Sequence, residues 1–102
     1  MSEKINRKLF LAFTELQILY HASKEPINGT WIIDEINNHG YSISPGTLYP
    51  ILNNMDKRGL LDKDEQVVEG KVRKYYTTTK KGLEAFDNAK NMANALMDEI
   101  SA

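Results

Sequence analysis

This chain of 102 residues has no cysteine, little proline or glycine, and no long hydrophobic run. The absence of cysteine excludes disulfide scaffolds, thiol catalysis and Cys-ligated zinc. Near the N-terminus the apolar run 9–13 has only five residues, whereas a membrane span needs roughly 20 and a signal peptide has a longer apolar core. No repeat or low-complexity linker divides the chain. We therefore expect a cytoplasmic protein built on one fold, with no membrane partner.

Neither sign of charge dominates, because the net charge is −1. The distribution is nevertheless uneven: residues 53–82 carry eight Lys or Arg against five Asp or Glu, whereas 1–52 and 83–102 are each net negative. A basic segment between two acidic ones is typical of a local surface for nucleic acid. A difference of this size also arises by chance, so it supports nucleic-acid binding only together with a motif.

The residue combinations of common enzymes and metal sites are missing as well. His21 and His39 are far apart in sequence, with no carboxylate at metal-ligand spacing. No general base stands beside the hydroxyls of Ser42, Ser44 or residues 77–79, and there is no glycine-rich phosphate loop or catalytic carboxylate pair. We expect no enzyme activity, no metal and no cofactor.

The segment 43–61, ISPGTLYPILNNMDKRGLL, is the most informative. Ser44 can accept hydrogen bonds from the free amides of a first helical turn, and Pro45 suits the next position, so a helix is predicted to begin here. At about 100° per residue, one face of this helix is apolar and the opposite face is small or amide-bearing. The apolar face comprises Leu48, Ile51, Leu52 and Met55, and the opposite face Gly46, Pro50, Asn53, Asn54 and Lys57.

Periodicity and turn residues predict the other elements. Gly40 and Gly59 are expected to end the second and third helices, Glu69-Gly70 to form a hairpin turn, and Thr79 to cap a last helix. Apolar residues recur at helical spacing along the first helix, at Ile5, Leu9, Phe13, Leu16, Leu19 and Tyr20, and Phe10 and Ile18 widen this stripe. The predicted helices are 5–24, 30–38, 45–58 and 80–100, and the predicted strands are 60–68 and 72–78.

Three helices, a two-stranded hairpin and a long last helix, in this order, describe a winged helix-turn-helix, a fold that is mainly α with one β-hairpin. The third helix is then the DNA reader, and the hairpin 60–78 is the wing. Residues 1–78 are predicted to form the DNA-binding domain and residues 79–102 the dimerisation helix.

Two segments, SPGTLYPILNNMDKRGLLDKD and GKVRKYYTTTKKGLEAF, resemble the PadR family of bacterial transcriptional regulators. The resemblance covers roughly residues 9–86, and the single last helix is similar to the compact branch of the family. It implies a homodimeric winged-helix regulator, in the first place a repressor, whose last helix makes the dimer. In one place the chain departs from the family pattern: INGTW, residues 27–31, stands where such proteins often have His-Gly-Tyr. This difference leaves the contacts of the second helix, and any ligand specificity, open.

Reading bases requires donors and acceptors that reach the groove edges. On the third helix Thr47, Asn53 and Asn54 supply them, and Asn suits adenine in the major groove. Tyr49 can donate to a phosphate or pack beside the core, and Lys57 can bind phosphate or only complement the helix dipole. The predicted DNA-contacting residues are Ser44, Thr47, Tyr49, Pro50, Asn53, Asn54, Lys57, Lys71, Arg73 and Lys74.

Pro50 would remove an internal hydrogen bond if the helix begins at Pro45, at a cost of about 3 kcal/mol. One interpretation is that the helix begins nearer Thr47, which leaves Pro50 in the tolerant first turn. The other is that the Pro50 ring makes an apolar contact with a thymine methyl.

On the wing, Lys71, Arg73 and Lys74 follow the turn and would reach phosphates or a narrow minor groove. The alternative is an ordinary hairpin with solvated charges. Tyr75 and Tyr76 alternate faces, so one is predicted to pack inward and the other to point outward.

A last helix of some 20 residues is about 30 Å long, which leaves too little domain to bury its whole apolar stripe. We expect homodimerisation through this helix and the first helix of the partner, with packing onto its own domain as the alternative. The predicted dimerisation residues are Ile5, Leu9, Phe13, Leu83, Phe86, Ala89, Ala93, Leu96, Met97 and Ile100.

The resemblance also allows a small aromatic or lipophilic effector between the protomers. Candidate pocket residues are Phe10, Tyr20, Trp31 and Met92, although residues of this kind more often belong to the core.

The predicted function is therefore sequence-specific binding of double-stranded DNA by a homodimeric transcriptional regulator. The alternative is a winged-helix module that no longer binds DNA and recognises another protein through the same surface.

Overall fold

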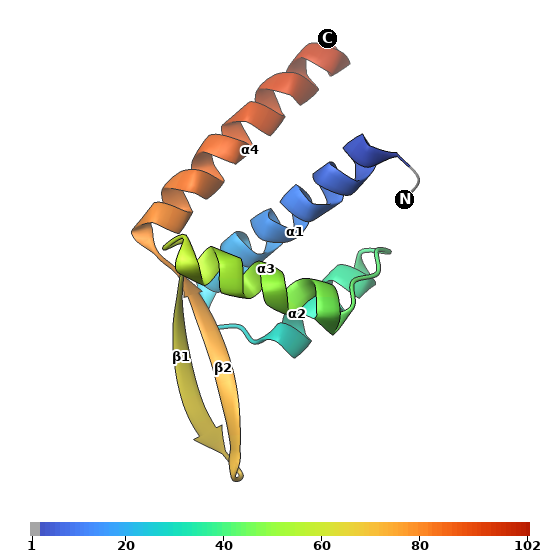
Figure 1. The fold of residues 1–102 in the computed structure, drawn as a ribbon. Helices are drawn as coiled ribbons and strands as arrows, with labels where there is room; N and C mark the ends of the chain where they lie inside the picture. The colour runs from blue at the N-terminus through green and yellow to red at the C-terminus, as the bar shows by residue number, and fades with distance from the viewer. Residues whose placement is uncertain (1–2) are drawn as a thin grey trace.

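The structure is a computed structural model that describes residues 3–102, with four helices and one antiparallel hairpin in that range (Figure 1). The order of elements predicted from the sequence is confirmed, and each bound lies within one residue of its prediction. In Figure 1 the hairpin extends to one side of the helices, while the far ends of α1 and α4 extend to the other. The elements are α1 (Lys4–Lys24), α2 (Gly29–Asn38), α3 (Pro45–Lys57), β1 (Leu61–Val68), β2 (Lys71–Thr78) and α4 (Lys80–Ser101).

The core lies where α1, α2 and α3 meet the base of the hairpin. On α3 the predicted apolar face is confirmed, because Leu48, Leu52 and Met55 are buried. The predicted stripe of α1 is only partly correct, since Ile5 and Leu9 are each 69% exposed. Burial on α1 instead centres on the side where Phe10 and Ile18 widen the predicted stripe, and the hydroxyl of Thr14 there is satisfied by donating to the Phe10 carbonyl. The buried row of α1 is Phe10, Thr14, Ile18, Leu19 and Ala22.

The first turn of α3 decides how Pro50 is accommodated. The Ser44 hydroxyl oxygen accepts a hydrogen bond from the Thr47 amide at 3.3 Å, and the helix begins at Pro45. The interpretation that the helix begins nearer Thr47 is therefore wrong, and Pro50 lies inside α3. Because Pro50 has no N–H, the Gly46 carbonyl lacks its usual helical donor. Both residues are exposed, so water can bind that carbonyl.

The hairpin is closed by a two-residue turn and tied to the helices at its base. Glu69 and Gly70 have positive φ values of 52° and 77°, as a type I′ turn requires. Tyr76 packs inward and Tyr75 is half-buried, in line with the predicted alternation. Ile27, just before α2, forms a β-bridge with Tyr76 through two backbone hydrogen bonds of 3.0 and 2.8 Å. The wing is thus attached to the start of α2 as well as to its own neighbours in sequence.

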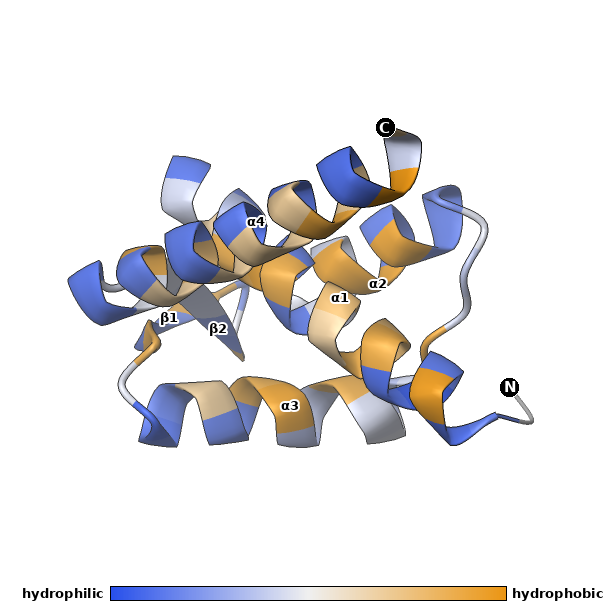
Figure 2. Ribbon diagram, turned by 90° about the horizontal axis from the view of Figure 1, so that it is seen from above, coloured by the Kyte–Doolittle hydropathy of each residue, from blue (hydrophilic) through white to orange (hydrophobic). Residues whose placement is uncertain are grey.

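Helix α4 is packed at its beginning and exposed at its end. The Thr79 hydroxyl caps it, accepting from the Gly82 amide at 3.0 Å and donating to the Gly59 carbonyl at 2.6 Å. Gly82 is buried where a Cβ would overlap the Leu60 carbonyl oxygen. From residue 91 onward every residue of α4 is exposed, and Figure 2 shows apolar positions continuing along the helix. No helix of the described chain combines the length and hydrophobicity needed to cross a membrane.

Candidate nucleic-acid interface

The outer face of α3 holds the predicted base-reading residues. Asn53 and Asn54 are both exposed, but their surroundings differ. The Asn54 side-chain oxygen accepts a hydrogen bond from Arg58 at 3.0 Å, and Arg58 also pairs with Glu15 of α1 at 3.1 Å. Asn53 lines a pocket beside the wing. Of the two amides, Asn53 is therefore the one directed toward the wing side of α3. Ser44, Pro50 and Lys57 are also exposed, and Thr47 is half-buried.

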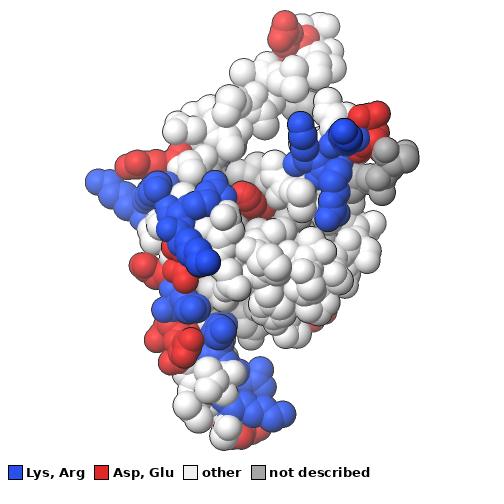
Figure 3. Space-filling view, in the orientation of Figure 1, with Lys and Arg blue, Asp and Glu red and all other residues white. Residues whose placement is uncertain are grey.

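The wing carries its predicted cations on β2. Lys71, Arg73 and Lys74 are all exposed, and none of them forms an ion pair with another residue in the range 3–102. Lys74 stands opposite Glu65 of β1 in the strand register. Figure 3 shows basic and acidic side chains interspersed along the wing, with basic ones gathered beside its base. The wing therefore offers free cations rather than a uniformly positive surface.

Tyr49 of α3 packs against the start of α2. A Cβ built on Gly29 would lie 2.7 Å from Cε1 and 2.8 Å from the hydroxyl oxygen of Tyr49. The Tyr49 ring can therefore occupy this position only because residue 29 has no side chain. The residue is 42% exposed, so the ring makes a helix–helix contact and still reaches the surface.

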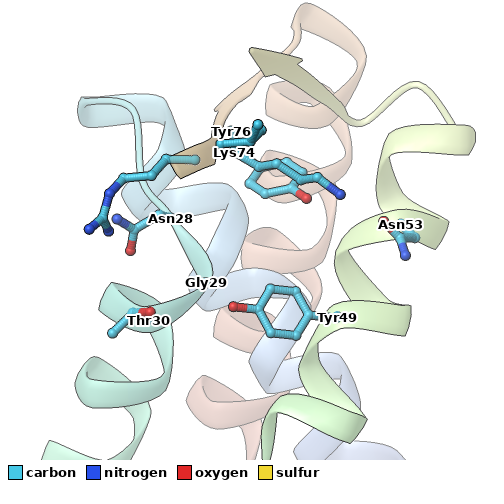
Figure 4. Close-up of a pocket in the computed structure, with 9 residues that line it drawn as sticks. Asn28, Gly29, Thr30, Tyr49, Asn53, Lys74 and Tyr76 are labelled. Carbon is cyan, nitrogen blue, oxygen red and sulfur yellow. The ribbon is translucent and has the colours of Figure 1, made fainter. Parts of the chain in front are cut away.

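A pocket of about 350 Å³ opens between the start of α2, the outer side of α3 and strand β2 (Figure 4). It brings together the motif on α3 and the basic residues of the wing, which are far apart in the chain. The Asn28 side chain accepts from the Trp31 amide at 2.8 Å and so caps α2 at the rim of this pocket. Its lining residues are Asn28, Gly29, Thr30, Tyr49, Asn53, Val72, Arg73, Lys74 and Tyr76.

Tyr76 forms the inner wall of the pocket. Its side chain is 1% exposed, and burial raises the pKa of its hydroxyl above the ordinary value of 10.0. The negative charges of Asp56 and of the ionised forms of Tyr49 and Glu65 raise this pKa further. The hydroxyl therefore keeps its proton at neutral pH and is available as a hydrogen-bond donor. Tyr76 is the inward-pointing member of the two adjacent tyrosines and is not among the residues that the sequence predicts to contact DNA.

A second polar cluster joins α1 to α2 away from this pocket. Glu35 lies between the two histidines, with its Oε1 3.7 Å from Nε2 of His21 and 3.1 Å from Nε2 of His39. Gln17 contacts the His21 ring at 3.0 Å. The expectation that no carboxylate accompanies these histidines is wrong, because His39 follows Glu35 by one helical turn and the packing of α1 on α2 brings His21 to the same carboxylate. Across residues 3–102, no three His, Asp or Glu side chains are arranged to hold a metal ion.

The four residues predicted for an effector pocket are dispersed over three places. Phe10 lines a groove of about 460 Å³ at the N-terminal half of α1, together with Asn6, Leu9, Phe13 and Tyr41. Tyr20 and Trp31 flank the His21 ring, each with a centroid distance of 4.9 Å. Met92 is 70% exposed on α4.

The residues predicted for dimerisation fall into two groups. Phe86 and Ala89, in the first half of α4, are half-buried, and Phe86 packs against the core. Phe13 on α1 is also half-buried, with its ring 5.4 Å from that of Tyr41. The others are exposed and form two apolar rows, one on each helix. The exposed members are Ile5, Leu9, Leu83, Ala93, Leu96, Met97 and Ile100.

The turn between α2 and α3 followed by a two-stranded wing defines the winged helix-turn-helix class of nucleic-acid-binding proteins. A profile of the Transcriptional regulator PadR-like family matches residues 18–88, and the chain belongs to this family. The family resemblance and the fold predicted from the sequence are thereby confirmed. The family is one of DNA-binding transcriptional regulators and not of enzymes.

Relatives of known sequence or structure cover almost the whole chain. Transcriptional regulator Rv3488 of Mycobacterium tuberculosis is 36% identical over 94 residues, which are 92% of this chain and 88% of that protein. The crystal structure of the PadR-like transcriptional regulator BC4206 of Bacillus cereus is similar with a TM-score of 0.80 and 30% identity, over 92% of this chain and 93% of that one. A PadR-like transcription factor of Bacteroides fragilis has the same fold, with a TM-score of 0.83 at 24% identity over 97% of both chains.

Proposed function

We propose that this regulator binds a specific double-stranded DNA sequence as a homodimer and represses transcription. The outer face of α3 enters the major groove, and the hairpin acts as a wing on the backbone or in the minor groove. The observation that carries this proposal is that Tyr49 and Asn53 of α3 line the same pocket as Arg73 and Lys74 of the wing. The base-reading element and the cationic element therefore face one partner.

Within this complex the predicted contacts have different roles. Asn53 and Thr47 read base edges, and Pro50 offers its ring to a thymine methyl. Ser44, Tyr49, Lys57 and the wing cations contact phosphates and set the register. Asn54 has a smaller share in readout, because its oxygen is already occupied by Arg58.

The proposed dimer uses the C-terminal part of the chain, 79–102, with α1 of the partner. At about 1.5 Å per residue, the 22 residues of α4 span about 33 Å, and only its first half has core beneath it. Leu96 and Ile100 are 55% and 66% exposed on the second half. Two copies related by a twofold axis would cover these rows with each other. A small aromatic or lipophilic effector would fit the apolar groove at Phe10 and Phe13, which adjoins the exposed row of α1.

Fluorescence anisotropy tests the DNA-binding proposal. The protein is titrated into a labelled duplex from upstream of its own coding sequence and into a scrambled duplex, at several salt concentrations. We expect tighter binding to the native duplex and affinity that falls as salt rises. Asn53→Ala should reduce the preference for the native duplex, by about 1–3 kcal/mol for a lost bidentate contact. Asn88→Ala, on exposed α4 surface, is the matched control.

Absence of binding to either duplex at low salt would favour the other class, a winged-helix module that binds a protein. In that case the same outer face of α3 is the surface to test, using co-purification of partners with the wild type and with Asn53→Ala.

A further inference from the structure

The wing tyrosine Tyr76 is 1% exposed, and its hydroxyl forms no hydrogen bond among residues 3–102. No fully buried side-chain oxygen or nitrogen of the described chain lacks a partner, so this hydroxyl is the accessible tip of an otherwise buried side chain. The pocket between α2, α3 and β2 is where this hydroxyl emerges, and in Figure 4 it points between Tyr49 and Asn53. A hydroxyl that opens only to a pocket finds its hydrogen-bond partner in what occupies the pocket, whether water or a ligand.

The start of α2 adds two free backbone donors to the same pocket. The Asn28 side chain satisfies the Trp31 amide, whereas the amides of Gly29 and Thr30 donate to no acceptor in the described chain. Both residues line the pocket. The first turn of a helix also carries the positive end of its dipole, which favours an anion.

Two cations and one more hydroxyl complete the lining. Lys74 and Arg73 come from β2, and Tyr49 comes from α3. Not one lining residue is Asp or Glu. The acids whose charges raise the Tyr76 pKa are outside the lining: Asp56 pairs with Lys63 at 3.8 Å, and Glu65 stands opposite Lys74 in the register. A pocket of this size with donors on three sides is suited to a group with several acceptor oxygens and negative charge.

We infer that this pocket holds one backbone phosphate of the bound DNA, with the Tyr76 hydroxyl as one of its donors. The inference rests on the proposed function, because the phosphate belongs to the duplex whose bases α3 reads. A strand that passes from α3 in the major groove to the wing must cross the space between them, and this pocket lies there. Such a contact fixes the register of the protein on the duplex without reading sequence.

The variant Tyr76→Phe tests the contact, since it removes the hydroxyl and keeps the buried ring. We expect roughly tenfold weaker binding to both the native and the scrambled duplex, as for a lost hydrogen bond to a charged group. The salt dependence should not change, because no charge is removed. Lys74→Gln should weaken binding and also reduce the salt slope by about one. Tyr75→Phe, at the half-buried neighbouring position, is the control and should bind like the wild type.

A duplex carrying a single uncharged methylphosphonate, moved along each strand, locates the phosphate. We expect one position per half-site at which the methylphosphonate weakens the wild type but has little further effect on Tyr76→Phe. Inorganic phosphate at millimolar concentration and constant ionic strength should not compete. Strong competition would identify a free anion as the ligand and overturn the assignment to DNA.

The outcomes separate this inference from the proposed function. If the wild type binds neither duplex, the proposed function fails. If the wild type binds and folded Tyr76→Phe binds equally well, the phosphate pocket is wrong and the proposed function stands. If circular dichroism finds Tyr76→Phe unfolded, the methylphosphonate scan on Lys74→Gln decides: a position that matters to the wild type and not to this variant supports the pocket, and no such position overturns it.

Discussion

The ring of Tyr49 on α3 lies over the backbone of Gly29 at the start of α2, in the space that any side chain at residue 29 would need. This contact sets how closely the two helices of the helix-turn-helix approach each other. It also gives a physical role to Gly29 in the segment INGTW, where the sequence departs from the usual family pattern. Tyr49 is therefore both a packing residue and a surface residue. Packing beside the core and donation to a phosphate, the two interpretations of Tyr49 from the sequence, are compatible.

Gly29→Ala should destabilise the fold, because the new Cβ would overlap the Tyr49 ring. We expect a loss of about 1–3 kcal/mol in the free energy of unfolding, the usual range for overpacking, measured by urea denaturation. Gly46→Ala is the matched control, since it adds a Cβ inside a helix where the nearest heavy atom is 3.8 Å away. That control should be neutral or more stable by up to about 1 kcal/mol. Equal stability of Gly29→Ala and the wild type would contradict the contact.

Replacing Lys71 and Arg73 together with alanine should weaken DNA binding whatever the sequence. Each of these cations is unpaired in the described chain, so each is free to displace a counterion from a phosphate. We expect the slope of log affinity against log salt to fall by about two, from anisotropy titrations at several salt concentrations. Lys8→Ala with Lys90→Ala removes the same charge from exposed positions outside the wing and should leave the slope unchanged. An unchanged slope in the wing variant would show that Lys71 and Arg73 do not contact phosphates.

Leu96→Asp with Ile100→Asp should convert the dimer to a monomer. Both side chains are exposed in the single chain, and charges there would be buried without partners in a dimer. We expect light scattering to give the mass of one protomer for this variant and of two for the wild type at micromolar concentration. Asn91→Asp with Asn94→Asp adds the same charge outside the apolar row of α4 and should remain dimeric. A wild-type mass of one protomer would refute the dimer itself.

The ionisation of Tyr76 should make folding stability depend on pH in alkaline solution. Burial raises the pKa of Tyr76 in the folded chain above 10.0, so the unfolded chain releases the proton first. This contribution to stability is therefore fully present below about pH 10 and decreases as the pH rises toward the higher folded pKa. Urea unfolding from about pH 9 to about pH 11 should lose stability more steeply for the wild type than for Tyr76→Phe. Parallel curves for the two proteins would contradict this assignment.

The architecture was predictable because the local signals are strong and agree with one another. Ser44 and Thr79 cap their helices, Glu69 and Gly70 turn the hairpin, and Gly59 has the positive φ expected at a helix end. These are short-range effects that depend on a few neighbouring residues. The predicted outer face of α3 was correct for the same reason, since helical periodicity alone fixes which residues oppose Leu48 and Leu52.

What the sequence did not disclose depends on contacts between distant segments. Phe10 and Leu9 are adjacent apolar residues on α1, yet the first is 6% exposed and the second 69%, because the elements packed against α1 cover only one side of that helix. Arg58, which donates to Asn54, also pairs with Glu15, and this ion pair requires α1 and α3 to lie close together. The phosphate pocket likewise combines α2, α3 and β2, so no single segment contains its pattern.

The β-bridge between Ile27 and Tyr76 has a mechanical consequence. Its two backbone hydrogen bonds join the segment that leads into α2 to β2, the strand that carries the wing cations. Together with the Tyr49 contact, they brace the wing and α3 against a common support. The distance between α3 and the wing is then set by the protein and not by the DNA that it binds. A fixed distance between α3 and the wing would favour duplexes whose groove widths already match it. It would disfavour duplexes that must be deformed to fit.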